Sequence, residues 1–496
     1  MAEWHSTLTP HALARQLAAA PAPARRGPAY RTLADRVSRL VADGRLPVGT
    51  RLPAERELAA ELQLSRTTVA AAYEALRTDG FLHSRRGAGS WTALPAGTRP
   101  PADALHPVSP DRGDVLDLGL AAPTAPPQLT EAAAHAVAQL PAYTGGHGNY
   151  PTGLPALREA VARRLTERGL PTGPDQVMIT TGAMSALHLV HQALLTRGDR
   201  VAVEAPSYVN TLRALQRSGA RLVPVPFAGG PDGADGRTGW DLAQWQRVLR
   251  GAAPKLASTV PDFQNPTGAL IDEDQRRALL AHARAAGTAV VTDETCAELG
   301  WGVADADLPR PLAALDRDAQ VITVGSAGKL LWPGLRIGWL RAQPSLVRKL
   351  AADRALYDLG TPVLDQLVAA RLLTEHLPAV RADRHAQLRA TAEAFTRLLP
   401  ARFPAWRAAA PPGGLALWVA TPGTPASALA RAGERLGVRI AAGAGFGVDG
   451  AFEEYLRLPL TLPADRVEEA LGRLAEAAEL ARAERFSAAD PAPAEL

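Results

Sequence analysis

The sequence predicts a large α/β domain with a largely parallel sheet, preceded by a small domain of three helices and a β-hairpin. Beyond residue 115, short apolar runs alternate with amphipathic stretches, which is typical of a parallel sheet covered by helices. Residues 28–92 carry helical periodicity, capping residues and turn signals instead. A tract rich in Pro and Ala separates the two patterns, and 496 residues are too many for one ordinary core. Two domains are therefore expected.

These patterns divide the chain into five parts. We call the small domain the head and the large domain the body. The parts are an N-terminal extension (1–27), the head (28–92), a linker (93–114), the body (115–482) and a flexible tail (483–496).

Composition limits the class of protein. The single cysteine, Cys296, excludes an intrachain disulfide framework and a cysteine-rich metal site, which favours a reducing compartment. The N-terminus lacks a signal-peptide pattern, and no run of about 18 apolar residues occurs. We therefore expect a cytoplasmic protein that neither spans a membrane nor binds a metal.

Charge is distributed unevenly along the chain. Residues 1–92 hold 13 arginines against 8 acidic residues, a net charge of +5, whereas the remainder holds 41 basic and 42 acidic residues. A basic N-terminal part favours contact with a polyanion such as nucleic acid, although ordinary surface arginines give the same excess.

The first three elements of the head are helices. Apolar residues repeat at helical spacing from Ala29 until Asp43-Gly44 ends the first helix. A second helix is expected at 54–62, and Ser65 can cap a third. The third helix is expected to turn four side chains inward: Val69, Ala72, Tyr73 and Leu76.

A hairpin wing follows the third helix, with strands through 81–83 and 90–92 and a basic glycine turn between them. The third helix can then present its N-terminal end to the major groove of DNA, where an arginine can hold a guanine edge. A helix pair with a capping serine and some arginines can also be purely structural. The expected DNA contacts are Arg56, Ser65, Arg66, Thr67 and Thr68, together with the wing residues Arg85 and Arg86.

Three segments of the head resemble the GntR family of winged helix-turn-helix regulators. They are GRLPVGTRLPAERELA (44–59), LSRTTV (64–69) and GAGS (87–90). The resemblance implies that Arg56, Arg66, Thr67 and Thr68 contact DNA. The head departs from the family at Ala70, where some members carry another DNA-contacting arginine.

Candidate residues in the body follow predicted strands. Ligands of open α/β sheets bind at the carboxyl ends of parallel strands. Thr181-Gly182, Asp293 and the pair Ser326 and Lys329 fall at such ends. The predicted strands are Val177–Thr180, Val201–Glu204, Leu222–Val225, Ala289–Thr292 and Val321–Val324.

Lys329 is one of only three lysines among 54 basic residues. A lysine kept where the chain otherwise uses arginine suggests chemistry that guanidinium cannot perform, such as Schiff-base formation with an aldehyde. Asp293 can keep a pyridinium nitrogen protonated, and together these are the requirements of pyridoxal 5'-phosphate. Taken singly, each residue has a simpler interpretation as a turn residue, a loop hydroxyl or a surface charge. The phosphate can be held by Ser326, Arg336 and the helix N-terminus at Gly182, Ala183 and Met184.

Residues 115–480 resemble the fold-type I aminotransferases. The resemblance rests on the lysine motif SAGKLLWPGLR (326–336), on NPTG (265–268) and on EAPSY (204–208). It implies that Asn265 hydrogen-bonds the phenolic oxygen of the cofactor, that Tyr208 stacks on its ring, and that Arg457 grips a substrate carboxylate.

Two positions depart from the aminotransferase pattern. The family often has a tyrosine two or three positions after the aspartate, where this chain has Thr295 and Cys296. We expect Cys296 to be a buried strand-end residue. Tyr150, in GNYPTG (148–153), resembles a tyrosine that reaches the site of the neighbouring subunit, but it stands nearer Gly153 than in most relatives.

A GntR-like head linked to an aminotransferase-like body resembles the MocR subfamily of regulators. The resemblance implies a DNA-binding transcription regulator that holds pyridoxal phosphate on Lys329 and senses it, or an amine or amino acid effector. It also implies a head-to-tail homodimer. The alternative is a working aminotransferase whose head localises or autoregulates it, and a third possibility is a regulator that uses the cofactor as a structural plug or as the signal.

Overall fold

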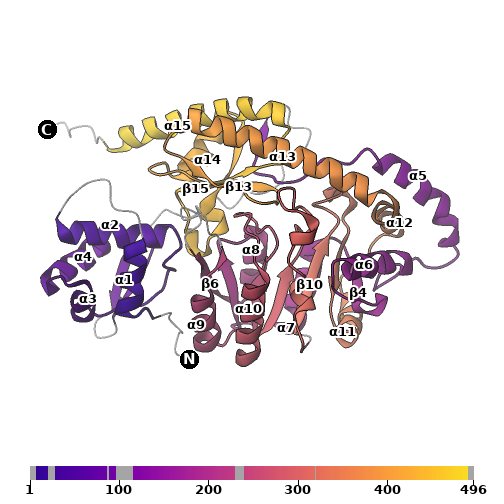
Figure 1. Ribbon diagram of the computed structural model, residues 1–496, viewed down its shortest axis with the longest axis horizontal. Coiled ribbons are helices and arrows are strands. Elements are labelled where there is room, and N and C mark those ends of the chain that lie inside the picture. Colours follow the sequence, from indigo (N-terminus) through magenta and orange to yellow (C-terminus); the bar gives the residue numbers. More distant parts are fainter. Residues whose placement is uncertain are drawn as a thin grey trace.

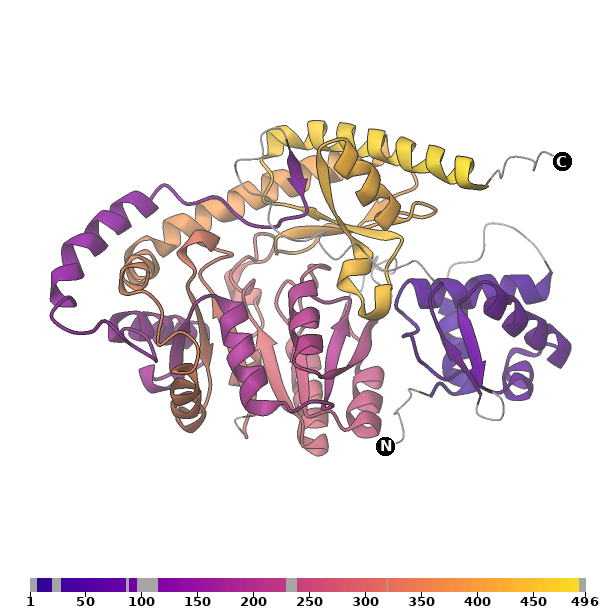
Figure 2. The ribbon, with the colours of Figure 1, turned by 180° about the vertical axis from the view of Figure 1, so that it is seen from behind.

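The computed structural model describes residues 7–19, 28–85, 89–95, 115–228, 239–318 and 320–489. The head lies beside the body in both views of the ribbon (Figure 1, Figure 2). Most of the expected linker lies outside the described residues.

The head has the expected helices and wing, with one helix more. Its elements are α1 (Pro10–Ala19), α2 (Ala29–Ala42), α3 (Glu55–Leu62), α4 (Arg66–Thr78), β1 (Leu82–Arg85) and β2 (Gly89–Thr92). The four α4 side chains expected to face inward are all buried. Asp43 ends α2, and Ser65 caps α4 by accepting a hydrogen bond from the Thr68 amide at 3.0 Å.

The N-terminal extension is part of the head where it is described. Leu13 and Leu17 of α1 are buried in the same apolar core as Val37 of α2 and Leu58 of α3. The packed domain therefore begins before the boundary expected at residue 28, because α1 adds apolar side chains to the head core.

The body is built on an eight-stranded sheet with the order β4-β11-β10-β9-β8-β5-β6-β7. All neighbours pair in parallel except at β11 and at the edge strand β7, which pair antiparallel. The five predicted strands are all present, and the sheet has three further strands, β7, β8 and β11, among the described residues. The bounds are β4 (Val177–Thr180), β5 (Arg200–Ala205), β6 (Arg221–Ala228), β7 (Gly239–Trp240), β8 (Leu256–Thr259), β9 (Ala289–Asp293), β10 (Val321–Ser326) and β11 (Gly338–Arg341).

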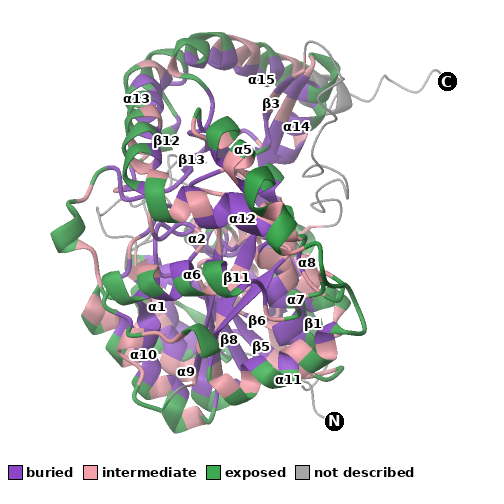
Figure 3. Ribbon diagram, turned by 90° about the vertical axis from the view of Figure 1, so that its right-hand side faces the viewer, coloured by how far each residue is buried: buried purple, intermediate pink, exposed green. Residues whose placement is uncertain are grey.

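Helices cover both faces of this sheet, because successive side chains of its strands point to opposite sides. Met178 packs into the cluster that contains α7, α8 and α11, whereas Val177 and Ile179 pack into the main core with α6, α9 and α10. Buried residues run through the strands, and exposed residues lie on the outer helix faces (Figure 3). The helices are α5 (Leu129–Gln139), α6 (Pro155–Glu167), α7 (Ala183–Leu194), α8 (Val209–Arg217), α9 (Leu242–Ala252), α10 (Glu273–Ala286), α11 (Pro344–Arg354) and α12 (Val363–Arg371).

A second, five-stranded sheet has the order β12-β13-β15-β14-β3. Its strand β3 comes from the start of the body and pairs in parallel with β14, so the sheet joins segments more than 300 residues apart. The expected flexible tail is helical as far as Ala489, because α15 continues past residue 482. The elements are β3 (Leu116–Leu118), α13 (Leu377–Arg402), β12 (Arg407–Ala408), β13 (Ala416–Ala420), α14 (Ala426–Arg435), β14 (Val438–Ala442), β15 (Tyr455–Pro459) and α15 (Val467–Ala489).

The head contacts the body at the loop that precedes β15. The Phe452 amide donates to the Ala42 carbonyl at 2.7 Å, and the Phe452 ring lies against Gly44. Leu94 packs both on the head core and on a group of body aromatics. We call that group the aromatic cluster: Trp418, Phe446, Phe452 and Tyr455.

Within the described part of the chain, the helices are too short or too polar to cross a membrane.

Candidate functional site

The carboxyl ends of the parallel strands bring most of the predicted body residues together. β9 ends at Asp293 and β10 at Ser326, while β5 and β8 lead into the loops of Tyr208 and Asn265. Parallel neighbours end at the same edge of a sheet, so residues far apart in sequence share one site there.

Lys329 follows β10 and lies partly buried in this site. Its Nζ donates to the Ala121 carbonyl at 3.0 Å, just beyond β3. The lysine charge also acts to lower the pKa of Asp293 and that of Cys296. The amine is thus held beside the ends of β9 and β10.

Asp293 accepts a hydrogen bond from the Thr295 amide at 2.9 Å. Burial raises the pKa of Asp293, and the Thr295 hydrogen bonds and the Lys329 charge act in the opposite direction. A cationic ring nitrogen beside Asp293 would compensate the negative charge of this buried carboxylate.

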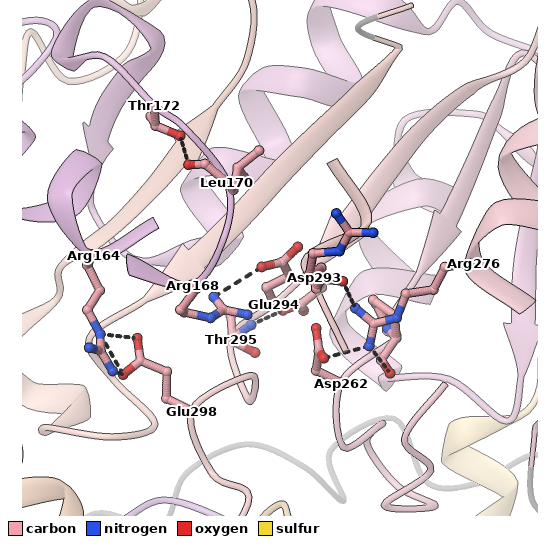
Figure 4. Close-up of polar contacts among 12 residues, drawn as sticks. Arg164, Arg168, Leu170, Thr172, Asp262, Arg276, Asp293, Glu294, Thr295 and Glu298 are labelled. Atoms are coloured by element: carbon pink, nitrogen blue, oxygen red, sulfur yellow. Dashed lines mark hydrogen bonds and ion pairs between the residues drawn. The ribbon is translucent and has the colours of Figure 1, made fainter. Parts of the chain in front are cut away.

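A network of ion pairs flanks Asp293 (Figure 4). Arg168 at the end of α6 lies 3.2 Å from the Glu294 carboxylate, and Arg276 of α10 lies 2.7 Å from Asp262. Burial raises the pKa of Glu294, and Arg168 opposes that shift. The first pair holds the residue that follows Asp293, and the second holds the segment after β8.

The predicted phosphate residues form a cup at the start of α7. Gly182 has φ +82°, and a Cβ added there would lie 2.8 Å from the Arg336 guanidinium. A Cβ at Gly338 would lie 2.4 Å from the Gly182 backbone, so both glycines keep the cup open. Ala183 and Met184 are the first two residues of α7. The Ser326 hydroxyl accepts a hydrogen bond from the Gly328 amide at 2.9 Å. Backbone N–H groups, a guanidinium and a hydroxyl are the donors that a phosphate requires.

Arg457, on β15, reaches this site from the second sheet. It is 4% exposed and lies 3.5 Å from Asn265 Oδ1, and it also donates to the Gly119 carbonyl. Its buried Nε has no hydrogen-bond partner. Burial lowers the pKa of Arg457 to about 10. A buried guanidinium with a free donor is suited to a carboxylate ligand.

Tyr208, Cys296 and Tyr150 have different positions. Tyr208 lies at the start of α8, where its hydroxyl accepts a hydrogen bond from Asn210 at 2.9 Å. Its electrostatic effect on Arg457 opposes the lowering of the Arg457 pKa by burial. Cys296 is 3% exposed, and burial raises the pKa of its thiol to about 11. Tyr150 instead packs edge-on against Tyr143, with ring centroids 6.3 Å apart.

The donor set at this edge fits pyridoxal phosphate. It offers an amine, a buried carboxylate, an open cup for phosphate and an amide beside an arginine. In the described part of the chain, no group of three or more His, Cys, Asp and Glu side chains is arranged to hold a metal ion.

Most of the predicted DNA contacts that the structure describes are exposed side chains of the head. Arg56, Ser65, Arg66 and Thr67 are exposed, and Thr68 is half-buried. The Ser65 hydroxyl lies 2.8 Å from that of Thr67 and 2.7 Å from that of Thr68, so it organises the start of α4 as well as capping it. Arg85 ends β1, and Arg86 lies outside the described residues.

Sequence reasoning missed several residues of the site. Glu204 is fully buried at the end of β5, and the quoted EAPSY stretch contained it without indicating a role. Arg354 is fully buried and donates to the Ile179 carbonyl at 2.5 Å and to Asp358, which accepts from Thr181 beside the cup. No local pattern reveals these contacts, because their partners are distant in sequence.

Two family models match the chain. Residues 29–91 match the gntR family of bacterial regulatory proteins, and residues 114–474 match the aminotransferase class I and II family. The two matches together include the head and most of the body.

Individual relatives fall into the same two groups. The chain is 29% identical to the uncharacterized HTH-type transcriptional regulator YisV of Bacillus subtilis, over 79% of this chain and 84% of that protein. It is 30% identical to the probable rhizopine catabolism regulatory protein MocR of Rhizobium meliloti, over 64% of this chain and 66% of that protein. Among solved structures, the α-aminoadipate aminotransferase LysN of Thermus thermophilus, complexed with N-(5'-phosphopyridoxyl)-L-leucine, superposes with a TM-score of 0.65. It is 32% identical and covers 74% of this chain and 93% of its own.

Proposed function

The chain belongs to the aminotransferase class I and II family and carries a gntR-family head, and on this basis we propose that it is a pyridoxal-phosphate-dependent transcription regulator. One observation carries the proposal: the exposed start of α4 and a site whose donor set fits pyridoxal phosphate occur in the same chain. The relatives named as HTH-type regulators support the same conclusion.

The body residues have distinct tasks in this proposal. Lys329 would hold the cofactor at its aldehyde carbon through the side-chain amine, and Asp293 would keep the ring nitrogen protonated. The cup at Gly182 and Arg336 would bind the phosphate, and Asn265 would bind the phenolic oxygen. When bound, pyridoxal phosphate supplies an aldehyde that reacts with amines and a ring that withdraws electrons.

Arg457 gives the site its effector class. Its unpartnered Nε and its buried position favour a ligand that carries a carboxylate, such as an amino acid. An amine without a carboxylate would leave the Arg457 Nε unpartnered and is therefore the weaker candidate.

The proposed regulator is a homodimer. Leu356 is 82% exposed, Tyr357 53% and Leu359 48%, and together they form an apolar loop that Arg354 anchors near the cup. Such a loop suits a second copy of the chain. A head-to-tail arrangement would let the head of one copy make the Ala42 to Phe452 contact on its partner.

A second candidate function is transamination. The Arg457 clamp favours it, because the same arginine would orient the carboxylate of an amino donor. Cys296 and Thr295 weigh against it, because neither provides the phenolic hydroxyl that often tunes the cofactor in the family.

The decisive experiment is a footprint of the full chain on its neighbouring intergenic DNA, with and without pyridoxal phosphate and amino acids. A protected site whose affinity changes with cofactor or amino acid is the expected result. Absence of specific binding at moderate salt would overturn the regulator. A parallel assay for multiple-turnover keto acid formation decides between regulator and aminotransferase.

A further inference from the structure

Arg51 lies on a short extended segment that continues the sheet of the wing. The amide of its neighbour Leu52 donates to the Ser90 carbonyl of β2 at 2.9 Å, and Arg51 itself lies opposite Trp91 in an antiparallel bridge. On the other side of the segment, the Leu8 amide donates to the Arg51 carbonyl at 3.0 Å. The backbone of Arg51 is therefore held from both sides.

The side chain of Arg51 faces away from the head core. Successive side chains of an extended segment point to opposite sides. Thr50 and Leu52 are 1% and 4% exposed, whereas Arg51 between them is exposed. Among the described residues, the Arg51 guanidinium makes no ion pair, unlike that of Arg31, which pairs with Asp79. Its positive charge is thus available to a ligand.

Gly89, the first residue of β2, leaves room for this guanidinium. A Cβ added at Gly89 would lie 2.7 Å from the Arg51 Nε and 3.3 Å from one of its terminal nitrogens. Gly89 pairs with Arg85, the last residue of β1, so the Arg51 guanidinium lies against the backbone at the end of the wing. A side chain that is packed in this way loses less conformational entropy when it binds a ligand.

The position of Arg51 favours a phosphate of the DNA backbone as its ligand. The chain runs from Arg51 to the predicted DNA contact Arg56 within five residues, so Arg51 lies between the wing and the start of α3. A guanidinium binds phosphate oxygens through a planar fork of donors. Because this guanidinium lies against the wing backbone, whereas Arg66 is the first residue of α4, a phosphate suits Arg51 better than a base edge.

We propose that Arg51 is a further DNA-binding residue of the head, which holds a backbone phosphate beside the wing and is positioned by Gly89. Such a contact adds affinity and fixes the orientation of the head without reading the base sequence. The inference rests on the proposed function, because that function supplies DNA as the partner.

The test measures the DNA affinity of the full chain, wild type and Arg51→Ala, for a footprinted site and for unrelated DNA. Salt is varied from about 50 to 200 mM. Arg51→Ala should weaken binding to both DNAs by about fivefold, because one charge-assisted contact is lost from each complex. The slope of log affinity against log salt should become shallower by about one, and the ratio of the two affinities should stay unchanged.

Arg31→Ala is the matched control, because it removes an arginine that is already paired with Asp79. This variant should keep the wild-type salt slope. An unchanged affinity and slope in Arg51→Ala would overturn the proposal. A loss confined to the footprinted site would show that Arg51 reads bases, which overturns the phosphate assignment.

Gly89→Ala tests the positioning of Arg51. Its added Cβ should displace the Arg51 guanidinium, weaken binding to both DNAs, and have little further effect in the Arg51→Ala background. Gly49→Ala is the control for left-handed strain, because Gly49 has φ +77° and nothing within 4 Å of an added Cβ. Additive effects of Gly89→Ala and Arg51→Ala would show that Gly89 does not position Arg51 and would overturn that part of the proposal.

Failure of the proposed function has a different signature. If wild type binds both DNAs equally, the regulator is overturned, whereas the salt slope on unrelated DNA still reports on Arg51. If wild type binds no DNA, both proposals fall. If Gly89→Ala does not fold, the comparison of Arg51→Ala with Arg31→Ala still decides whether Arg51 binds a phosphate.

Discussion

The head and the body present their functional residues in opposite ways. On the head, Arg56 and Arg66 are exposed at the face predicted to meet DNA. In the body, Lys329 and Arg457 are bonded to the carbonyls of Ala121 and Gly119, more than 200 residues away. The difference lies in which molecule provides the hydrogen-bond acceptors. On the head, the donors are open to the phosphates and bases of DNA, whereas in the body other parts of the chain hold the donors in place.

The largest expected effect tests the body. Lys329→Ala should abolish the visible absorption of bound pyridoxal phosphate, because no other amine lies at that edge among the described residues. The head should stay folded and retain nonspecific DNA binding, since its core is separate from that of the body. Absorption spectra and borohydride trapping measure the change.

Lys349→Ala is the matched control for this experiment. Lys349 lies on α11, and its Nζ is 3.4 Å from the Ala193 carbonyl, outside the site. This variant should keep the full absorption. A borohydride-trappable adduct that persists in Lys329→Ala would refute the assignment of Lys329.

The same contrast explains how much the sequence could predict. The head follows from local signals: Ser65 caps α4 as expected, and Val69, Ala72, Tyr73 and Leu76 are buried, because capping and periodicity act over a few residues. Strand ends placed Asp293 and Lys329 in the body by the same local logic.

Other parts of the body could not be predicted in this way. β3 joins the second sheet beside β14, and the buried Glu204 accepts hydrogen bonds from Trp240 and Gln264, which are 36 and 60 residues away. Those contacts are set by tertiary packing, which leaves no local pattern. The contribution of α1 to the head core was missed because one short amphipathic helix does not reveal its partner.

An intermediate effect is expected on the head. Arg66→Ala should weaken specific DNA binding by about 1–3 kcal/mol, roughly 5- to 150-fold, because an exposed arginine at the start of α4 can hold a guanine edge. Nonspecific binding should weaken less. Titrations with a footprinted site and with unrelated DNA at one salt concentration give the ratio.

Arg31→Ala is the control for charge alone. Arg31 lies on α2 and pairs with Asp79 at 3.0 Å, so the variant removes an arginine without changing the start of α4. Its specificity ratio should match wild type. An equal ratio in Arg66→Ala would contradict the placement of α4 in the groove.

The smallest expected effect lies where the two regions meet. Gly44 has φ +63°, and a Cβ added there would lie 2.4 Å from the Phe452 ring. Phe452 belongs to the aromatic cluster, and Phe446 of that cluster lies 5.3 Å from the Arg457 guanidinium. Gly44→Ala should therefore displace the head from the loop beside the effector clamp.

Gly49 separates this displacement from simple backbone strain. It has φ +77° with nothing within 4 Å of an added Cβ, so Gly49→Ala carries the same left-handed strain, about 1–2 kcal/mol, without the collision. We expect the ratio of DNA affinities with and without cofactor and amino acid to fall about fivefold in Gly44→Ala and to stay near wild type in Gly49→Ala. Equal ratios in the two variants would mean that the Phe452 contact does not connect the head to the site. In that case ligand binding would have to reach the DNA face by another route, such as the arrangement of the two copies in a dimer.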